Sequence, residues 1–156
     1  NFLNHNSESL CMSLTDWVIP FIRHRDVLKQ QIKDIEQKNS VVHVRFKDDK
    51  VQEYFIFDDK LDFTAVFDAA KKSDTDQNYS AHIVCYNTEA NLKVLIEHWQ
   101  ECCLHQRLTF YFVNPKSATD IKWIINPWLH NKISDTKNLE TGLKSMFSMV
   151  EEWKVG

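Results

Sequence analysis

Histidines and cysteines are the residues of this chain with the richest chemistry, because both types bind metals and both take part in catalysis. The histidines form neither His-Glu-x-x-His nor a His-x₃-His pair, which bring two zinc ligands to one face of a helix. His98 and His105 fall on one predicted helix, but they are about 10.5 Å apart along its axis, too far for both to bind one zinc ion. The spacing therefore predicts no metal site, and no motif indicates another cofactor. The seven histidines are His5, His24, His43, His82, His98, His105 and His130.

The four cysteines have the pattern of structural residues. None forms a Cys-x-x-Cys pair, and Cys102 and Cys103 are adjacent, which is the wrong spacing for a zinc knuckle. Cys85 lies in an apolar run, whereas a thiolate nucleophile needs an exposed position beside a base. Together with Cys11, these residues are predicted to be reduced thiols that behave as small apolar side chains, as is typical of cytoplasmic proteins.

Glycine occurs only twice, at Gly142 and Gly156, and this scarcity excludes several common chemistries. Gly-x-Gly-x-x-Gly and Walker A loops need several glycines, because their backbone approaches phosphate closely and adopts positive φ angles. Neither motif fits this chain, and neither does the Gly-x-Ser-x-Gly turn that carries the nucleophile of many hydrolases. Binding of dinucleotides or nucleoside triphosphates by those loops is therefore excluded.

Paired carboxylates occur in turns or at a helix end, where a solvated charge needs no catalytic explanation. The segment Asp58-Asp59-Lys60 follows a predicted strand and resembles the acid-and-lysine sites of nucleases. The Glu-x-Lys strand of such enzymes is missing, so we interpret the segment as a turn. The pairs are Asp48/Asp49, Asp58/Asp59 and Glu151/Glu152.

Basic residues gather on the first predicted helix, where Arg23 and Arg25 lie near Trp17. Acidic residues on the same helix balance this charge, as on an ordinary solvated helix face. The whole chain has a formal net charge of −3, so no overall positive field attracts nucleic acid. We therefore do not expect nucleic acid as a partner.

Length and composition predict one domain. The chain has 156 residues, of which 43% are hydrophobic and 26% charged, and two halves of this length would each be too small for a good core. Residues 1–12 are polar and aperiodic, so we expect a loose arm there and a single domain over residues 13–156. The chain shows no signal-peptide pattern and no apolar run of about 18 residues, which favours a soluble cytoplasmic protein that does not span a membrane.

Hydrophobic periodicity predicts an α/β domain with a mixed sheet of about five strands flanked by helices, in the order α-β-β-α-β-α-β-β-α. The first helix is predicted to begin near Asp16 or Pro20. It should continue to about Lys38, because Phe21, Leu28 and Ile35 repeat every seven residues. The predicted strands are 41–46, 51–57, 81–86, 108–113 and 121–125, and the later helices begin near Asp62, Asn87–Thr88 and Ser134–Asp135.

The C-terminal segments leave one alternative open. Residues 121–125 are predicted to be a strand antiparallel to its predecessor, because Trp-Ile-Ile favours strands and Pro127 stops a helix. A short helix is the alternative. In the last helix, Gly142 indicates close packing against a neighbour. The buried face of that helix is predicted to contain Leu139, Leu143, Phe147 and Val150.

Two stretches look alike, since 82–99 and 108–123 each contain an apolar strand closed by Asn, then a polar stretch, a Lys and a Trp. This similarity predicts successive units of one parallel sheet. From the second strand onward, the element order resembles a thioredoxin-like βαβαββα succession. The Cys-x-x-Cys motif of that family is absent, and so is a Pro before the third strand of the motif, so the resemblance implies no activity and no site residue.

The best predicted site lies beyond the carboxyl ends of the parallel strands, where open α/β sheets bind ligands. Asn87 and Asn114 end two such strands, although Asn also caps helices and favours turns. His130 would be the catalytic candidate there if the segment Pro127–Lys132 were a loop folded back onto this edge. The remaining candidates for ligand binding are Thr88, Lys116 and Ser117.

Two functions of different class follow. The first is a non-enzymatic binding or protein-interaction module, with contact surfaces at Trp128 and on the first helix around Arg23 and Arg25. That helix would pair with a protein partner or with a second copy of the chain. The alternative is a small enzyme of hydrolase or transferase type, with His130 as its acid or base near Asn87 and Asn114.

Overall fold

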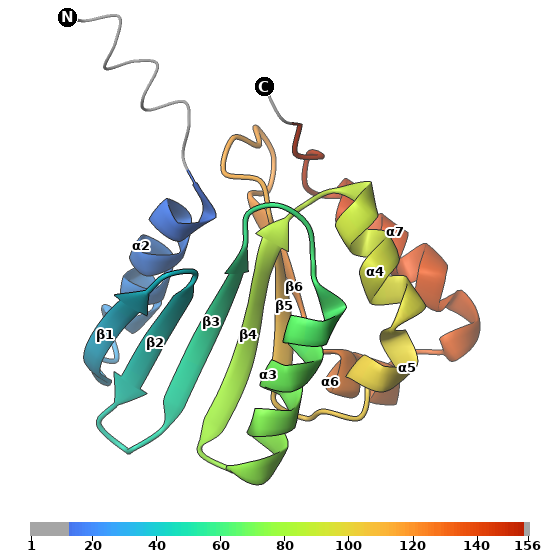
Figure 1. The fold of residues 1–156 in the computed structure, drawn as a ribbon. Coiled ribbons are helices and arrows are strands. Elements are labelled where there is room, and N and C mark those ends of the chain that lie inside the picture. Colours follow the sequence, from blue (N-terminus) through green and yellow to red (C-terminus); the bar gives the residue numbers. More distant parts are fainter. Residues whose placement is uncertain (1–12, 155–156) are drawn as a thin grey trace, which may run out of the picture.

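A six-stranded sheet forms the centre of the protein in a computed structural model that describes residues 13–154. The strands follow the order β1-β2-β3-β4-β5-β6, so each strand lies beside its neighbour in the sequence. β1, β2 and β3 are antiparallel, β3, β4 and β5 are parallel, and β6 is antiparallel to β5 (Figure 1). The strands are β1 (Ile32–Lys38), β2 (Val41–Phe46), β3 (Val51–Phe57), β4 (Tyr79–Tyr86), β5 (Leu108–Val113) and β6 (Lys122–Ile125).

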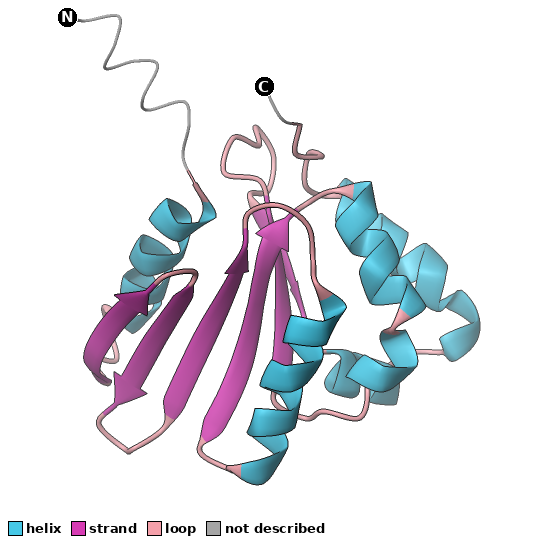
Figure 2. Ribbon diagram, in the orientation of Figure 1, coloured by secondary structure: helices cyan, strands magenta, loops and turns pink. Residues whose placement is uncertain are grey.

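Helices cover the two faces of this sheet unequally (Figure 2). Among the described residues, α2 is the one helix on the first face, where it buries Leu14, Val18 and Ile22. Helices α3, α4, α5 and α7 build the core on the second face, and α6 packs against α5. The predicted mixed α/β architecture is confirmed, with six strands instead of about five. The helices are α2 (Leu14–Asp26), α3 (Phe63–Thr75), α4 (Glu89–Glu97), α5 (Trp99–Cys102), α6 (Pro127–Ile133) and α7 (Leu139–Ser148), with a 3₁₀ turn at Thr136–Asn138.

The first helix ends twelve residues earlier than predicted, at Asp26 instead of near Lys38. The Asp26 carboxylate accepts hydrogen bonds from the N–H groups of Gln31 and Ile32, at 2.8 and 3.1 Å. Gln30 takes a positive φ of 48°, which reverses the chain direction. The prediction of one long helix is therefore wrong. The Asp26 carboxylate stabilises a turn directly after the helix, and the chain leaves the helical conformation there.

The residues after this turn form β1, where a β-bulge gives the buried residues a spacing that also fits a helix. Ile32 and Ile35 are three residues apart, which matches one face of a helix. The pairing of β1 with β2 shifts between Ile32 and Asp34, so both isoleucines pack on the α2 side of the sheet. Leu28, predicted to be buried in the same stripe, is 96% exposed.

Two strand–helix–strand units build the middle of the sheet. β3 and β4 are joined through α3, and β4 and β5 are joined through α4 and α5. Both units step in the same direction across the sheet, so connections of the same hand place these helices on the same face. The predicted parallel pairing of β4 and β5 is confirmed. From β3 onward the elements contain the expected βαβαββα succession, with its second helix divided at His98 and with α6 added.

The C-terminal part confirms one prediction and corrects three. Residues 122–125 form a strand antiparallel to β5, as predicted. Pro127–Lys132, expected to be a loop, belongs to helix α6, because Asn126 Oδ1 accepts a hydrogen bond from the Leu129 N–H at 3.1 Å and Pro127 fits the first turn. α7 begins only at Leu139, after the 3₁₀ turn. A side chain at Gly142 would meet open space, so the predicted close packing there is wrong.

On the α3 side, no helix from residues 13–154 lies over one half of the sheet. Figure 1 shows α3 in front of β4, while no helix lies in front of β1 and β2. Side chains from β2 and β3 on this side are only partly buried, in contrast to the fully buried residues of β4. We call this region the open sheet face and define it by Val41, His43, Glu53 and Phe55, which line one shallow concavity.

Candidate functional site

The predicted edge does bring the two asparagines together. Asn87 follows β4 and Asn114 follows β5, and the Asn87 N–H donates to the carbonyl of Val113 at 2.9 Å. Both side chains are almost fully buried. The parallel pairing of β4 with β5 therefore places them at one end of the sheet, as the sequence indicates.

The C-terminal segment 147–153 occupies this edge. The Asn87 side-chain amide donates to the carbonyls of Phe147 and Val150, at 3.2 and 3.0 Å, and its oxygen accepts from Trp123 Nε1 at 2.7 Å. Asn114 Nδ2 donates to the carbonyl of Glu151 at 3.0 Å. The two side chains thus bind the backbone of their own chain, which ties its C-terminal segment to the sheet.

The other candidates at this edge also have intramolecular partners. Thr88 caps α4 through the Asn91 N–H, and Ser117 Oγ accepts from the Glu151 N–H at 3.3 Å. The Lys116 ammonium lies over the Trp153 ring, 5.1 Å from its centre. The N-terminus of α4 is also occupied by a side chain of the protein itself, because the Glu152 carboxylate accepts a hydrogen bond from the N–H of Glu89.

His130 lies at the opposite end of β5 from Asn114. Asn126, which caps α6, donates to the carbonyl of Gln106, just before β5 begins. The His130 ring stands perpendicular to the Trp99 ring, at a centroid distance of 5.7 Å. The structure therefore does not bring His130 to the Asn87–Asn114 edge, because its segment is a helix at the other end of the strand.

The residues predicted to form contact surfaces are accessible. Arg23 and Arg25 lie on the exposed side of α2, with the Arg25 guanidinium 5.3 Å from the centre of the Phe21 ring. Trp128 is half-buried on α6, and the Lys132 ammonium lies 3.7 Å from the centre of its ring. Arg23 and Arg25 belong to α2, and Trp128 belongs to α6. The two groups do not contact each other, so they form two separate surfaces.

A cluster that the sequence did not single out lies on the open sheet face, around Glu53. Its carboxylate receives hydrogen bonds from Tyr79 at 2.7 Å and from Lys72 at 3.0 Å, both at Oε1. Its other oxygen, Oε2, lies 3.2 Å from His43 Nδ1. The four side chains come from β2, β3, α3 and β4, so the register of three strands and the position of one helix bring them together.

This setting fixes the charge of Glu53. Partial burial would raise its pKa, but the hydrogen bonds from Tyr79, Lys72 and His43 outweigh burial and hold the pKa below its usual value. Burial and the neighbouring carboxylate raise the pKa of Tyr79, which keeps its hydroxyl protonated as a donor. Glu53 is therefore a carboxylate at neutral pH, although only 15% of its side chain is exposed.

One signal in the sequence could have revealed this cluster. Alternate positions of β3 on this side carry Val51, Phe55 and Phe57, and Glu53 interrupts that apolar row. A charged residue in an apolar row of a half-buried strand needs a partner. The partners Lys72 and Tyr79 are distant in sequence, so only the pairing with His43 across the hairpin was within reach of sequence analysis.

A second histidine cluster lies on the opposite face of the sheet, under α2. His82 Nδ1 is 2.8 Å from the Tyr111 hydroxyl, and Nε2 is 2.8 Å from Ser80 Oγ. The Tyr54 ring stacks on the imidazole at 4.5 Å. Burial lowers the pKa of His82 to about 3, with a small contribution from Arg25. This ring stays neutral, so it is too weak a base to activate the Ser80 hydroxyl at neutral pH.

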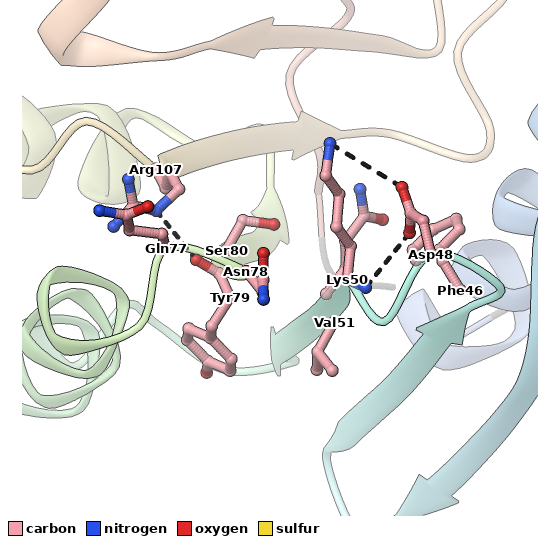
Figure 3. Close-up of a pocket in the computed structure, with 10 residues that line it drawn as sticks. Phe46, Asp48, Lys50, Val51, Gln77, Asn78, Tyr79, Ser80 and Arg107 are labelled. Carbon is pink, nitrogen blue, oxygen red and sulfur yellow. Dashed lines mark hydrogen bonds and ion pairs between the residues drawn. The ribbon is translucent and has the colours of Figure 1, made fainter.

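A small cavity of about 220 Å³ lies beside this second cluster, at the ends of β3 and β4 where these strands begin. Figure 3 shows Lys50 and Arg107 on opposite sides of it, with Asn78 and Ser80 between them. Lys50 pairs with Asp48, and Arg107 donates to the backbone carbonyl of Tyr79 at 3.1 Å. The cavity is smaller than most ligand pockets, and both cations have partners within the chain.

Comparison with known proteins identifies no relative, because no protein-family model, no curated protein and no solved structure matches this chain. Within residues 13–154, none of the helices has the length and apolar character needed to cross a membrane. The same residues contain no group of three or more metal-binding side chains.

Proposed function

We propose that the chain is a protein-interaction module and that its contact surface is the outward side of α6. The observation that carries this proposal is the exposure of Leu129 and Ile133, which are 51% and 77% accessible to solvent. Leu104 lies beside the start of α6, since Cys103 Sγ contacts the carbonyl of Pro127, and Leu104 is also largely exposed. Apolar side chains that gather in this way mark contact sites more often than single exposed leucines do.

The geometry of α6 explains this exposure. Pro127 is buried and His130 packs against Trp99, so these residues face the protein. Residues four apart lie on the same side of a helix, which places Leu129 and Ile133 together on the outside. The stacked pair of Trp128 and Lys132 lies next to them. We call Leu104, Trp128, Leu129, Lys132 and Ile133 the α6 surface.

The charge around the α6 surface favours a partner that is both apolar and acidic. Helix α6 itself contains His130 and Lys132 but no Asp or Glu. A symmetric pairing of two copies would bring Lys132 near its equivalent in the other copy, which disfavours self-association. An amphipathic helix with leucines on one side and glutamates beside them would bury the apolar residues and pair with the lysine.

A direct test uses two synthetic amphipathic helices with the same leucines, one carrying glutamates and the other lysines beside them. We expect the glutamate peptide to shift the amide NMR signals of α6 and to bind at least tenfold more tightly than the lysine peptide. The double variant Leu129→Ser with Ile133→Ser should lose this binding, because burial of each side chain contributes about 1.5–3 kcal/mol. Leu28→Ser is the control, since Leu28 is an even more exposed leucine but lies on the turn after α2.

Three results would overturn the proposal. They are equal binding of the two peptides, signal shifts centred away from α6, and a dimer in light scattering that the double variant abolishes. The enzymatic alternative at the Asn87–Asn114 edge has less support, because the C-terminal segment already engages both asparagines there.

We also propose a cytoplasmic location for this module. Cys85 and Cys102 are buried and unpaired, and burial raises the pKa of both thiols, that of Cys102 to about 12. Such thiols act as small apolar side chains and are compatible with a reducing compartment. A nucleophilic role for Cys85, which its apolar neighbours in the sequence already disfavour, has no support here either, since a buried neutral thiol is unreactive.

A further inference from the structure

The open sheet face contains a concavity of about 440 Å³, which is within the usual range for small-molecule sites. Val41 and Phe55 give it an apolar floor, and Lys38 and Asn39 lie on its rim. His43 and Glu53 provide its central polar groups. Because no helix of the described part of the chain covers this region of the sheet, a ligand would reach the two polar side chains directly.

The two ring nitrogens of His43 have different surroundings. Nδ1 lies against the Glu53 carboxylate, so a neutral imidazole carries its proton there and donates it. Nε2 has no hydrogen-bond partner among the described residues, and a third of the side chain is exposed. The ring therefore lines the concavity with an unpaired basic nitrogen, held in one tautomer by the carboxylate.

The carboxylate itself is held rigidly by Tyr79 and Lys72, which come from other elements. The Lys72 ammonium donates one of its three N–H groups to Glu53, and more than half of this side chain is exposed. Lys72 does not line the concavity, so its part is to hold the Glu53 carboxylate in place. Two further charged residues of β1 line the concavity, namely Lys38 and Glu36, and Glu36 lies directly opposite His43 in the sheet.

Two other histidines in the described part of the chain pair with carboxylates, and neither has this combination of features. His98 lies 3.1 Å from Glu101 on the same helical stretch, but that carboxylate is exposed and has no second donor. His105 lies 2.7 Å from Asp74, but its ring is buried and its edge meets Phe67. His43 combines a partly buried carboxylate, fixed by two further donors, with a ring that lines a concavity.

We infer that His43 is the general acid–base residue of a hydrolytic site for small carboxylic esters, with Glu53 as its positioning residue. The apolar floor favours esters with an aryl or short acyl group. This site is independent of the α6 surface. It uses no residue of that helix.

The reaction is balanced without any co-reactant. His43 Nε2 accepts a proton from a water molecule while the water oxygen attacks the carbonyl carbon of the ester. The bond between that carbon and the leaving oxygen then breaks, and the leaving oxygen takes the proton from Nε2. One ester and one water become one carboxylic acid and one alcohol.

The test measures hydrolysis of p-nitrophenyl acetate and p-nitrophenyl butyrate by the full chain. We expect His43→Gln to lower kcat/KM at least tenfold, towards the rate of the ester in buffer. His98→Gln is the matched control and should change kcat/KM less than twofold, because its ring is equally exposed and also faces a carboxylate. Unchanged hydrolysis in His43→Gln, or an equal loss in both variants, would overturn the inference.

A second measurement separates a positioning role of Glu53 from a merely structural one. Nitrogen-15 NMR should show the neutral His43 ring protonated at Nδ1 in the native chain and a mixture of tautomers in Glu53→Gln. In the same variant kcat should fall while KM stays within about twofold, and Glu53→Asp should restore part of kcat. A native ring protonated at Nε2, or a change in KM alone, would contradict the role given to Glu53. The double variant Leu129→Ser with Ile133→Ser should leave hydrolysis unchanged, so that failure of one proposal does not imply failure of the other.

Discussion

His43 and His82 lie on opposite faces of the same sheet, with β3 between their strands, and they have opposite chemistry. His82 is surrounded by neutral partners, namely the hydroxyls of Ser80 and Tyr111 and the ring of Tyr54. His43 faces the anionic Glu53 and lies at the surface. The residue type is the same, but α2 covers the His82 ring, whereas none of the helices within residues 13–154 covers the His43 ring.

This difference shows that cover and partner chemistry decide what a histidine does. A ring enclosed by neutral groups avoids charge, because burial penalises the imidazolium ion. A ring beside a carboxylate keeps one nitrogen fixed and leaves the other for solvent or ligand. The first arrangement stabilises the core, and the second is the arrangement that acid–base catalysis needs.

The largest expected effect is the acid sensitivity caused by His82. Its pKa of about 3 in the folded chain lies below its ordinary value of 6.5, so the unfolded chain binds the additional proton between these values. Stability from this group is complete above pH 6.5 and falls by about 1.4 kcal/mol per pH unit as the pH decreases towards 3. Urea unfolding at pH 7 and 4.5 should show His82→Phe losing about 3 kcal/mol less than the native chain over this interval. Equal losses would show that His82 does not titrate in this way.

The next largest effect is expected at the fixed carboxylate. Glu53→Gln should lower the free energy of unfolding by about 2–3 kcal/mol at pH 7, because it removes charge-assisted hydrogen bonds to a partly buried carboxylate. The pKa of Glu53 is lowered in the folded chain, so its contribution is present above the ordinary value of 4.5 and disappears as the pH falls through the folded value. The difference between the two proteins should therefore shrink below about pH 4. Glu101→Gln, at the exposed pair with His98, should change stability by less than about 0.5 kcal/mol.

A smaller effect is expected from Tyr79→Phe, which removes one donor to Glu53. The variant should lose about 1–2 kcal/mol in urea unfolding. Its Glu53 pKa should rise, since one of the hydrogen bonds that lower it is gone. Titration of the Glu53 side-chain carbon by NMR measures this directly, and an unchanged pKa would mean that Lys72 and His43 alone fix the charge.

The smallest effect on stability is expected from His43→Gln. The ring is partly exposed and its loss leaves Glu53 with two donors, so the free energy of unfolding should change by less than about 0.5 kcal/mol. The equivalent change at His82 should cost several times more, measured under the same conditions, because it disrupts a buried network. Similar costs for the two variants would remove the contrast between the two sides of the sheet.

Much of the fold was predictable because most elements carry a local signal. The strands that contain Val42, Val84 and Phe110 follow apolar runs or alternation, and Asp62 and Thr88 cap helices as expected. The end of the first helix was not predictable, because the spacing of Ile32 and Ile35 fits both a helix and a bulged strand. Only pairing with β2 distinguishes these two structures.

For the candidate sites too, some features were predictable from the sequence and others were not. Parallel strands made the proximity of Asn87 and Asn114 predictable, since each asparagine ends a strand. Their partners were not predictable, because backbone carbonyls of the C-terminal segment have no side-chain signal in the sequence. His130 was misplaced because capping by Asn126 makes a helix where a loop was expected.

The sequence by itself determined the α/β class, the absence of glycine-dependent phosphate loops, and the apolar character of Cys85 and Cys102. These properties depend on composition and on patterns within a few residues. Tertiary structure decided which histidine is enclosed, which sheet face stays open, and that His43, Glu53, Lys72 and Tyr79 meet. Residues from four elements come together only through strand register and helix placement, and no local pattern encodes that contact.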